Sequence, residues 1–191
     1  MKIAEIKIYP IWATYRNQLI IKVESDQGYY GWGESGVSGR ELAVKGAAEH
    51  FRQFLLGKDP RRIGALWQEL YRSQYFEGGR VLTGAMAALD IALHDLVARS
   101  LNVRVYQLLG GAQRDSVPCF PTSGALSGPA VIEDARRLIR AGWQVIRFVP
   151  GHPDTGGDAA LFEPRESIAL PAEWMIKVRE ALGRGPVLGI D

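Results

Sequence analysis

The stretch Asp26–Glu34, DQGYYGWGE, decides how the first part of this chain folds. Its first three residues predict a tight turn, and residues 29–34 have the composition of a β-strand. A second strand-like run, LIIKVE at 19–24, lies just before the turn. An earlier strand is expected to begin with Ile3, Ile6 and Ile8. The first 34 residues therefore predict an antiparallel β-meander.

After the meander, apolar residues recur at helical spacing. Ser38 is expected to cap a first helix, and Glu41, three residues later, to complete a capping box. This helix should end at Gly57. Asp59-Pro60 predicts the start of a second helix, with the cap followed by proline in the first turn.

A third helix, over residues 81–101, is the most apolar of the set. Its small residues should let neighbouring elements approach closely: Gly84, Ala85, Ala87, Ala88 and Ala92. A short helical turn at 106–109 then ends at Gly110-Gly111. The meander and these helices together predict an α+β domain over residues 1–115.

From about residue 115 the pattern alternates between strand and helix. Such alternation with short connections predicts right-handed crossovers and a parallel sheet. Residues 116–191 therefore predict the first three β/α units of a TIM-type barrel, whose closed form has eight strands. The expected strands are 117–120, 142–149 and 187–190, and the expected helices are 129–141 and 171–182.

The composition is that of a soluble globular protein, with 47% hydrophobic and 23% charged residues among 191. Basic and acidic residues, 23 and 21, are interspersed, which gives no reason to expect binding to nucleic acid or to a membrane. The N-terminus lacks the apolar core of a signal peptide. One cysteine, Cys119, excludes an intrachain disulfide and fits the reducing cytoplasm. Its apolar neighbours predict that Cys119 is buried and unreactive.

The segment Gly31–Gly36 matches the dinucleotide-binding pattern G-x-G-x-x-G. That fingerprint requires the first strand of a parallel βαβ unit, whereas this strand is the return arm of a hairpin. The glycines are better explained by a strand end and a tight loop.

The tripeptide Gly189-Ile190-Asp191 places a carboxylate at the end of an apolar strand. Chemistry in a β/α barrel gathers at the carboxyl ends of the strands, so Asp191 is a candidate metal ligand. A single carboxylate does not hold Mg²⁺, which takes about six oxygen ligands. A solvated terminal residue is the alternative.

This order of parts resembles the enolase superfamily, specifically its mandelate racemase-like branch. Asp26–Glu34 resembles the D-x-G-x-x-G-x-G-E hairpin of that branch. Ala88–Asp95, ALDIALHD, resembles its A-x-D-x-A-L-W-D helix, with His94 where Trp is usual. Val105–Gly111 resembles its P-x-x-x-L-L-G-G segment, and residues 189–191 resemble the strand that presents the first metal ligand. The resemblance implies an N-terminal capping domain followed by the start of the barrel.

Within that branch the chain is most similar to the acid-sugar dehydratases that act on mannonate or galactonate. Ser38–Val44, SGRELAV, is similar to N-G-R-E-L-A-V, with Ser38 in place of the Asn expected to touch substrate. Residues 145–147, VIR, and 162–165, FEPR, are similar to A-I-R and F-E-P-R. In mannonate dehydratases a Tyr partners the Arg as base, but residues 151–161 contain no Tyr. This departure argues against mannonate and leaves another acid sugar as the substrate.

The resemblance implies Mg²⁺-dependent abstraction of the proton α to a carboxylate, with Asp191 as a metal ligand. The metal would stabilise the negative charge that develops on the carboxylate oxygens. Relatives usually carry Lys-x-Lys on the second barrel strand, where this chain has Val145 and Arg147. Arginine keeps its proton at neutral pH, so Arg147 is expected to bind or polarise the substrate rather than act as a base. An Arg147 that pairs with a structural carboxylate is the alternative.

The resemblance also implies that the loops near Arg16 and Ser38 cover the mouth of the barrel and select the substrate. Arg16 suits a carboxylate, and Tyr75 and Arg80 are expected at the same mouth. His152, after the second barrel strand, is expected to reach the substrate cavity. An exposed, solvated role is the alternative for each of these residues.

The sequence thus predicts a cytoplasmic lyase that eliminates water from a small-molecule acid sugar, with Mg²⁺ as cofactor. The 191 residues alone should be inactive, because they lack further metal ligands and a base. The open edge of an incomplete sheet favours a homo-oligomer. Two alternatives remain, a racemase or cycloisomerase of the same superfamily and a non-catalytic truncated scaffold.

Overall fold

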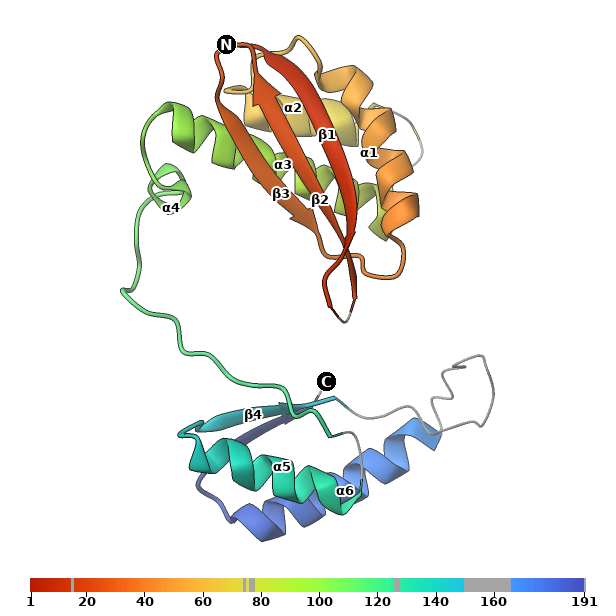
Figure 1. Cartoon of the computed structure of the whole chain (residues 1–191), viewed down its shortest axis with the longest axis vertical. Helices are drawn as coiled ribbons and strands as arrows, with labels where there is room; N and C mark the ends of the chain where they lie inside the picture. The colour runs from red at the N-terminus through yellow and green to blue at the C-terminus, as the bar shows by residue number, and fades with distance from the viewer. Residues whose placement is uncertain (15, 74, 76–77, 126–127, 150–165, 191) are drawn as a thin grey trace. The chain divides into compact units, whose positions relative to one another are not determined.

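The computed structural model describes residues 1–191 except 15, 74, 76–77, 126–127, 150–165 and 191. Its contacts divide the chain into two units, Met1–Gln113 and Arg114–Asp191. Figure 1 shows the two units and the long segment that joins them. Each unit has a hydrophobic core of its own, so each is described by itself.

Unit 1 begins with the predicted antiparallel β-meander. Strands β1 (Ile3–Trp12), β2 (Asn17–Ser25) and β3 (Tyr30–Ser35) form one sheet in the order β1-β2-β3. Gly28, with φ of +83°, closes the turn between β2 and β3. This left-handed conformation favours glycine, which explains why the turn ends with that residue.

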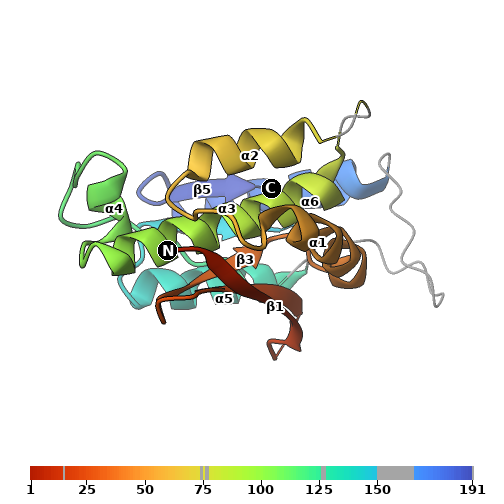
Figure 2. The same ribbon diagram turned by 90° about the horizontal axis from the view of Figure 1, so that it is seen from above.

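Helices cover one face of the sheet. They are α1 (Glu41–Leu55), α2 (Ile63–Tyr71), α3 (Arg80–Ser100) and α4 (Val105–Leu108). Helix α3 lies between the sheet and α2, as Figure 2 shows. Its buried side chains and those of α1 meet the inward residues of the strands in a single core. The predicted helical part of the first domain is therefore confirmed.

Backbone contact between β3 and α3 sets the distance between the sheet and the helices. A Cβ atom on Gly33 would lie 1.9 Å from the carbonyl oxygen of Ala88, and one on Gly31 would lie 2.0 Å from that of Ala92. Only glycine on the strand and small residues on the helix allow this approach. The predicted thinness of the third helix is thus confirmed, and the glycines serve packing rather than a dinucleotide.

A side chain near the end of the same helix also accepts a hydrogen bond from the free edge of the sheet. The backbone N–H of Trp32 donates to Asp95 Oδ2 at 2.9 Å, across the edge of β3. Arg99 Nε donates to both oxygens of Asp95 at 3.1 Å, and its guanidinium stacks 4.9 Å from the ring centre of Tyr30. Asp95, the last residue of the motif ALDIALHD, therefore joins α3 to the edge strand.

Two predicted helix caps are wrong. Helix α1 begins at Glu41 with Arg40 as its N-cap and no side-chain capping bond, while the Ser38 hydroxyl donates to the Asn17 carbonyl oxygen at 3.1 Å. Helix α2 begins at Ile63, and the Asp59 carboxylate instead accepts from the backbone N–H and the guanidinium of Arg61. In both places the polar side chain has a partner outside the helix, which competes with capping.

Unit 2 consists of α5 (Pro129–Arg140), β4 (Val145–Phe148), α6 (Glu166–Leu182) and β5 (Val187–Ile190). Strands β4 and β5 pair in parallel, with Val145 opposite Val187. The core of the unit gathers buried residues from both helices and from β4: Val131, Ala135, Leu138, Ile146, Phe148 and Val178. Alternation of helix and parallel strand is thus observed, whereas a TIM barrel is not visible in the part of the chain that the structure describes.

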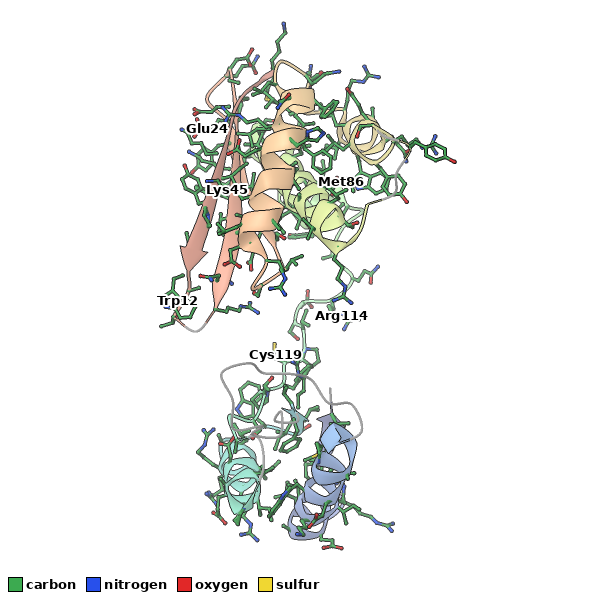
Figure 3. The ribbon with its side chains drawn as sticks, turned by 90° about the vertical axis from the view of Figure 1, so that its right-hand side faces the viewer. Trp12, Glu24, Lys45, Met86, Arg114 and Cys119 are labelled. Atoms are coloured by element: carbon green, nitrogen blue, oxygen red, sulfur yellow. The ribbon has the colours of Figure 1, made fainter. Side chains whose placement is uncertain are left out.

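The predicted strand at 117–120 is wrong, since none of these described residues belongs to a strand. The nearest sheet pairing is one parallel bridge between Thr122 and Arg147. Pro118 and Pro121 remove backbone donors from this segment, which explains why pairing is confined to a single residue. The predicted burial of Cys119 is also wrong, because this residue is exposed in the segment that follows Arg114 (Figure 3).

Helix α3 is long and apolar enough to cross a membrane by length and composition alone. Half of its most apolar window is buried inside unit 1. Its packing against β3 identifies it as the core helix of this unit.

We predict that Gly33→Ala strongly destabilises unit 1. The new methyl group would overlap the Ala88 carbonyl and force α3 away from the sheet, at a cost of about 3 kcal/mol or more. Urea denaturation followed by circular dichroism measures the loss. The matched control is Gly46→Ala in the middle of α1, where a Cβ atom meets nothing within 4 Å. The free energy of unfolding of this control should rise by roughly 0.5–1 kcal/mol, because alanine has a higher helix propensity than glycine. Equal stability of the two variants would contradict the close-contact explanation.

Candidate functional site

Arg147 lies on β4 between two core residues. Ile146 and Phe148 are 0% and 3% exposed and pack against α5 and α6. Side chains alternate along a strand, so the Arg147 side chain leaves from the opposite face of the sheet. This face is the one that a closed barrel would turn inward.

The backbone of Arg147 is held from both sides. Its N–H donates to the Pro121 carbonyl at 2.9 Å, and its carbonyl accepts from the Ser123 N–H at 2.8 Å. On the other side its register partner is Gly189 of β5. Among the described residues, the atom nearest to a Cβ on Gly189 would be the Ile146 carbonyl oxygen, at 3.9 Å. The backbone position of Arg147 is therefore fixed by the sheet, and its side chain is half-buried.

A carboxylate that sequence reasoning missed holds the loop next to Arg147. Asp134 of α5 accepts hydrogen bonds from the Ser123 hydroxyl at 2.8 Å and the Gly124 N–H at 2.9 Å. Arg137 donates to its other oxygen at 2.6 Å. Burial tends to raise the pKa of Asp134, but the hydrogen bonds from Ser123, Arg137 and Gly124 outweigh it and lower the pKa overall. Asp134 is thus an ionised anchor for the loop that pairs with Arg147.

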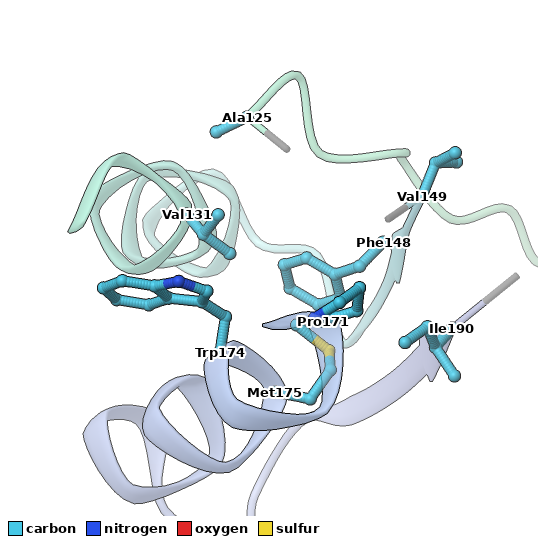
Figure 4. Close-up of a pocket in the computed structure, with 8 residues that line it drawn as sticks. All are labelled: Ala125, Val131, Phe148, Val149, Pro171, Trp174, Met175 and Ile190. Carbon is cyan, nitrogen blue, oxygen red and sulfur yellow. The ribbon is translucent and has the colours of Figure 1, made fainter. Parts of the chain in front are cut away.

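An apolar cavity lies between the helices and the carboxyl ends of β4 and β5 (Figure 4). Phe148 and Ile190 reach it from the strands, and Trp174 and Met175 reach it from α6. Its volume of about 10 Å³ is near that of one water molecule. The cavity belongs to the core beneath the strands and does not accommodate a sugar.

In unit 1 the predicted substrate residues gather at one end. Arg16 and Ser38 are exposed in two loops joined by the bond from Ser38 to Asn17. Arg80 opens α3, whose Gly84 packs against Val37 of the second loop. Figures 1 and 3 show the β1–β2 hairpin at the same end as the starts of α1 and α3.

Tyr75 lies in the connection between α2 and α3 and is 92% exposed. His152 and Asp191 lie outside the described residues. Among the residues that are described, no group of three or more His, Cys, Asp or Glu side chains is arranged to hold a metal ion. The described residues therefore do not form a magnesium site by themselves.

A surface hollow of about 410 Å³ lies on the outer side of α3. His94 Nδ1 is 2.9 Å from the Asp90 carbonyl and 3.3 Å from Asp90 Oδ2. His94 thus bonds within its own helix. The hollow is lined by Trp32, Asp90, Ile91, His94, Asp95, Val105 and Leu109.

Comparison with known proteins now identifies this arrangement. Residues 12–110 match the N-terminal domain of the mandelate racemase / muconate lactonizing enzyme family. The chain belongs to this family. The match covers β2, β3 and all the helices of unit 1, so unit 1 is the N-terminal capping domain of an enolase-superfamily protein.

Relatives extend the similarity over unit 2. A D-galactonate dehydratase from Variovorax paradoxus is 32% identical over 191 residues, 100% of this chain and 48% of its own length. A D-galactonate dehydratase family member from Marinomonas is 36% identical over 98% of this chain and 48% of its own. The chain thus spans about half the length of these relatives.

Solved structures agree with the fold. An enolase from Pantoea ananatis with bound D-gluconate and Mg superposes with a TM-score of 0.85 at 26% identity, over 100% of this chain and 53% of that one. The 3,6-anhydro-D-galactonate cycloisomerase of Zobellia galactanivorans gives a TM-score of 0.79 at 30% identity, over 100% and 51%. The family of this capping domain therefore contains both dehydratases and a cycloisomerase.

We predict that Asp134→Asn lowers the stability of unit 2 by roughly 1–3 kcal/mol at pH 7, because the loop loses charge-assisted hydrogen bonds. Hydrogen exchange of the Ile146 and Phe148 amides measures this unit alone. The pKa of Asp134 is lowered in the folded state, so its stabilisation is present above the ordinary aspartate pKa and is lost as pH falls through the depressed value. The difference between variant and wild type should therefore shrink in strong acid.

The neighbouring Glu133→Gln is the matched control for that substitution. Glu133 has a side chain that is 67% exposed and pairs with Arg136 on the same helix. Its loss should cost under about 0.5 kcal/mol. A cost for Glu133→Gln as large as that for Asp134→Asn would contradict the anchoring role.

Proposed function

We propose that the chain is part of an Mg²⁺-dependent lyase that removes the proton α to the carboxylate of an acid sugar and eliminates water. The observation that carries this proposal is similarity over the whole chain to D-galactonate dehydratases. Unit 1 would serve as the capping domain, and unit 2 would be the beginning of the barrel.

The geometry of unit 2 supports the barrel. Its strands are parallel, α6 connects them, and the Thr122 bridge places a third segment beside β4. A continuous barrel needs a partner for each edge of this sheet. We propose that further strands pair beside β5, and that the sheet face carrying Arg147 becomes the lining of the barrel.

Arg147 would orient the substrate on that face. A guanidinium stays protonated at neutral pH and offers a planar pair of donors, which suits a carboxylate or a polarised oxygen. Arg147 would then stabilise negative charge as the proton leaves, and another group would act as the base.

We further propose Asp191 as one ligand of Mg²⁺. Asp191 follows Gly189, the partner of Arg147, by two residues, and a strand that continued to Asp191 would place both side chains on one face of the sheet. When bound, the metal would neutralise charge on the substrate carboxylate. The other ligands would come from outside the described residues, since Mg²⁺ needs several oxygens.

Arg16, Tyr75, Arg80 and His152 remain proposed substrate residues around the mouth of the barrel, with Ser38 in a loop of the same site. Two guanidinium groups, an imidazole and a phenol suit a polyhydroxy acid. We also propose a homo-oligomer in the cytoplasm. The cycloisomerase relative favours one alternative, a reaction that shares the proton abstraction but loses no water.

We predict that the 191-residue chain alone does not turn over an acid sugar, because one proposed ligand cannot retain the metal. The purified chain is incubated with Mg²⁺ and D-galactonate or D-gluconate, and keto-deoxy acid is measured. Mg²⁺-dependent product from these residues alone would contradict the expectation.

The polypeptide that the source organism makes should form the keto-deoxy acid, and removal of the metal with EDTA should abolish this activity. Isomerised product without dehydration would favour the cycloisomerase.

In the active polypeptide, Arg147→Met should lower kcat about 100- to 1,000-fold, the usual cost of removing one donor that stabilises developing charge. Steady-state kinetics measure the effect, and circular dichroism verifies folding. Arg140→Met is the matched control, since Arg140 is exposed in the last turn of α5 on the same unit. Near-wild-type activity of Arg147→Met would exclude Arg147 from the reaction.

A further inference from the structure

Three arginines from three separate segments lie at the hairpin end of unit 1. Arg16 belongs to the β1–β2 hairpin, Arg40 ends the turn after β3, and Arg80 begins α3. All three side chains are exposed. Among the described residues, Glu34 and Glu41 flank the turn after β3. This end of the unit is therefore suited to an anion.

Two contacts connect these segments. The Ser38 hydroxyl donates to the Asn17 carbonyl at 3.1 Å, which ties the turn to the residue that follows Arg16. Val37 fills the space beside Gly84, where a Cβ atom would lie 2.7 Å from Val37 Cγ2. Gly84 is one helical turn after Arg80, so the same short turn touches both the hairpin and the start of α3.

The turn itself is well defined. The Arg40 N–H donates to the Val37 carbonyl at 3.3 Å, and Gly39 adopts φ of +77°. This places Ser38 at the second position of a tight turn, with glycine in the left-handed conformation after it. The hairpin is closed separately by the Ala13 N–H, which donates to the Arg16 carbonyl at 2.9 Å. The Ser38 hydroxyl therefore joins the turn to the hairpin, and each of these two segments is also held by a backbone hydrogen bond of its own.

We propose that Ser38 is a positioning residue, which holds the hairpin bearing Arg16 against the turn bearing Arg40. Its hydroxyl is directed to Asn17 and acts on the substrate through that loop. The inference rests on the proposed function, because Arg16 is a substrate residue only if an acid sugar binds at this end. Recognition of a carboxylate by arginine depends on a fixed guanidinium position, so anchoring of the loop supports binding.

Trypsin tests the anchor directly, since it cleaves after Arg16, next to the bonded carbonyl. The purified 191-residue chain is digested briefly, and the fragment 1–16 is quantified by mass spectrometry. Ser38→Ala should raise the rate of this cleavage about 2- to 10-fold, the effect expected from loss of one hydrogen bond on the opening of the loop. Ser38→Thr keeps the hydroxyl and should restore the wild-type rate.

Ser100→Ala is the matched control. The Ser100 hydroxyl also donates to a backbone carbonyl, that of Val97 at 2.8 Å, but at the other end of α3. It should leave cleavage after Arg16 unchanged. An unchanged rate in Ser38→Ala, or an equal rise in Ser100→Ala, would overturn the positioning role.

Kinetics of the active polypeptide supply the second readout. Ser38→Ala should raise the KM for the acid sugar by a larger factor than it lowers kcat, because a loosened Arg16 weakens binding in the ground state as well as in the transition state. A fall in kcat without a rise in KM would overturn the inference. Proteolysis needs neither metal nor substrate. An inactive polypeptide would therefore reject the proposed function, and the digestion result would still show whether Ser38 holds the hairpin.

Discussion

The backbone contact between β3 and α3 determines the rest of unit 1. Gly31 and Gly33 bring the strand against the Ala88 and Ala92 carbonyls, at distances that no side chain on β3 would permit. At this separation Asp95 reaches the Trp32 N–H on the edge of the sheet. The same alignment places Gly84 beside Val37, so the start of α3 meets the loop after β3. One close approach therefore sets the layer spacing, the protected edge and the end at which the arginines gather.

The fold was predictable where the local backbone geometry allows only a few residue types. Glycine at 28, 31 and 33 and small residues along α3 leave few other arrangements. The parallel pairing of β4 with β5 likewise follows from alternation along the chain. The errors occur where several partners compete for one polar group. Ser38 and Asp59 have the residue types of helix caps, yet each has a different partner in the folded unit.

The candidate site was harder to predict than the fold. Arg147 was proposed from the similarity of residues 145–147 to A-I-R, but the residues that hold it were not foreseen. Its backbone partners, Pro121 and Ser123, follow residues 117–120, which were predicted as a strand but form none, because Pro118 and Pro121 lack backbone donors. Asp134, the anchor of that segment, lies in a helix and has no spacing signature. Its carboxylate contacts depend on the fold bringing α5 beside the loop, which no local pattern encodes.

Ser38 shows how a change in one side chain can alter a site without abolishing it. A serine hydroxyl is shorter than an asparagine amide, and here it bonds to the adjacent loop instead of extending beyond it. The interaction connects two loops, and under the proposed function the charge for anion binding would come from Arg16, Arg40 and Arg80. Specificity at this end would depend on how rigidly these guanidinium groups are held, because a flexible cation attracts many anions whereas a fixed one selects by geometry. The resemblance of residues 38–44 to the family motif thus did not predict which atom the Ser38 side chain contacts.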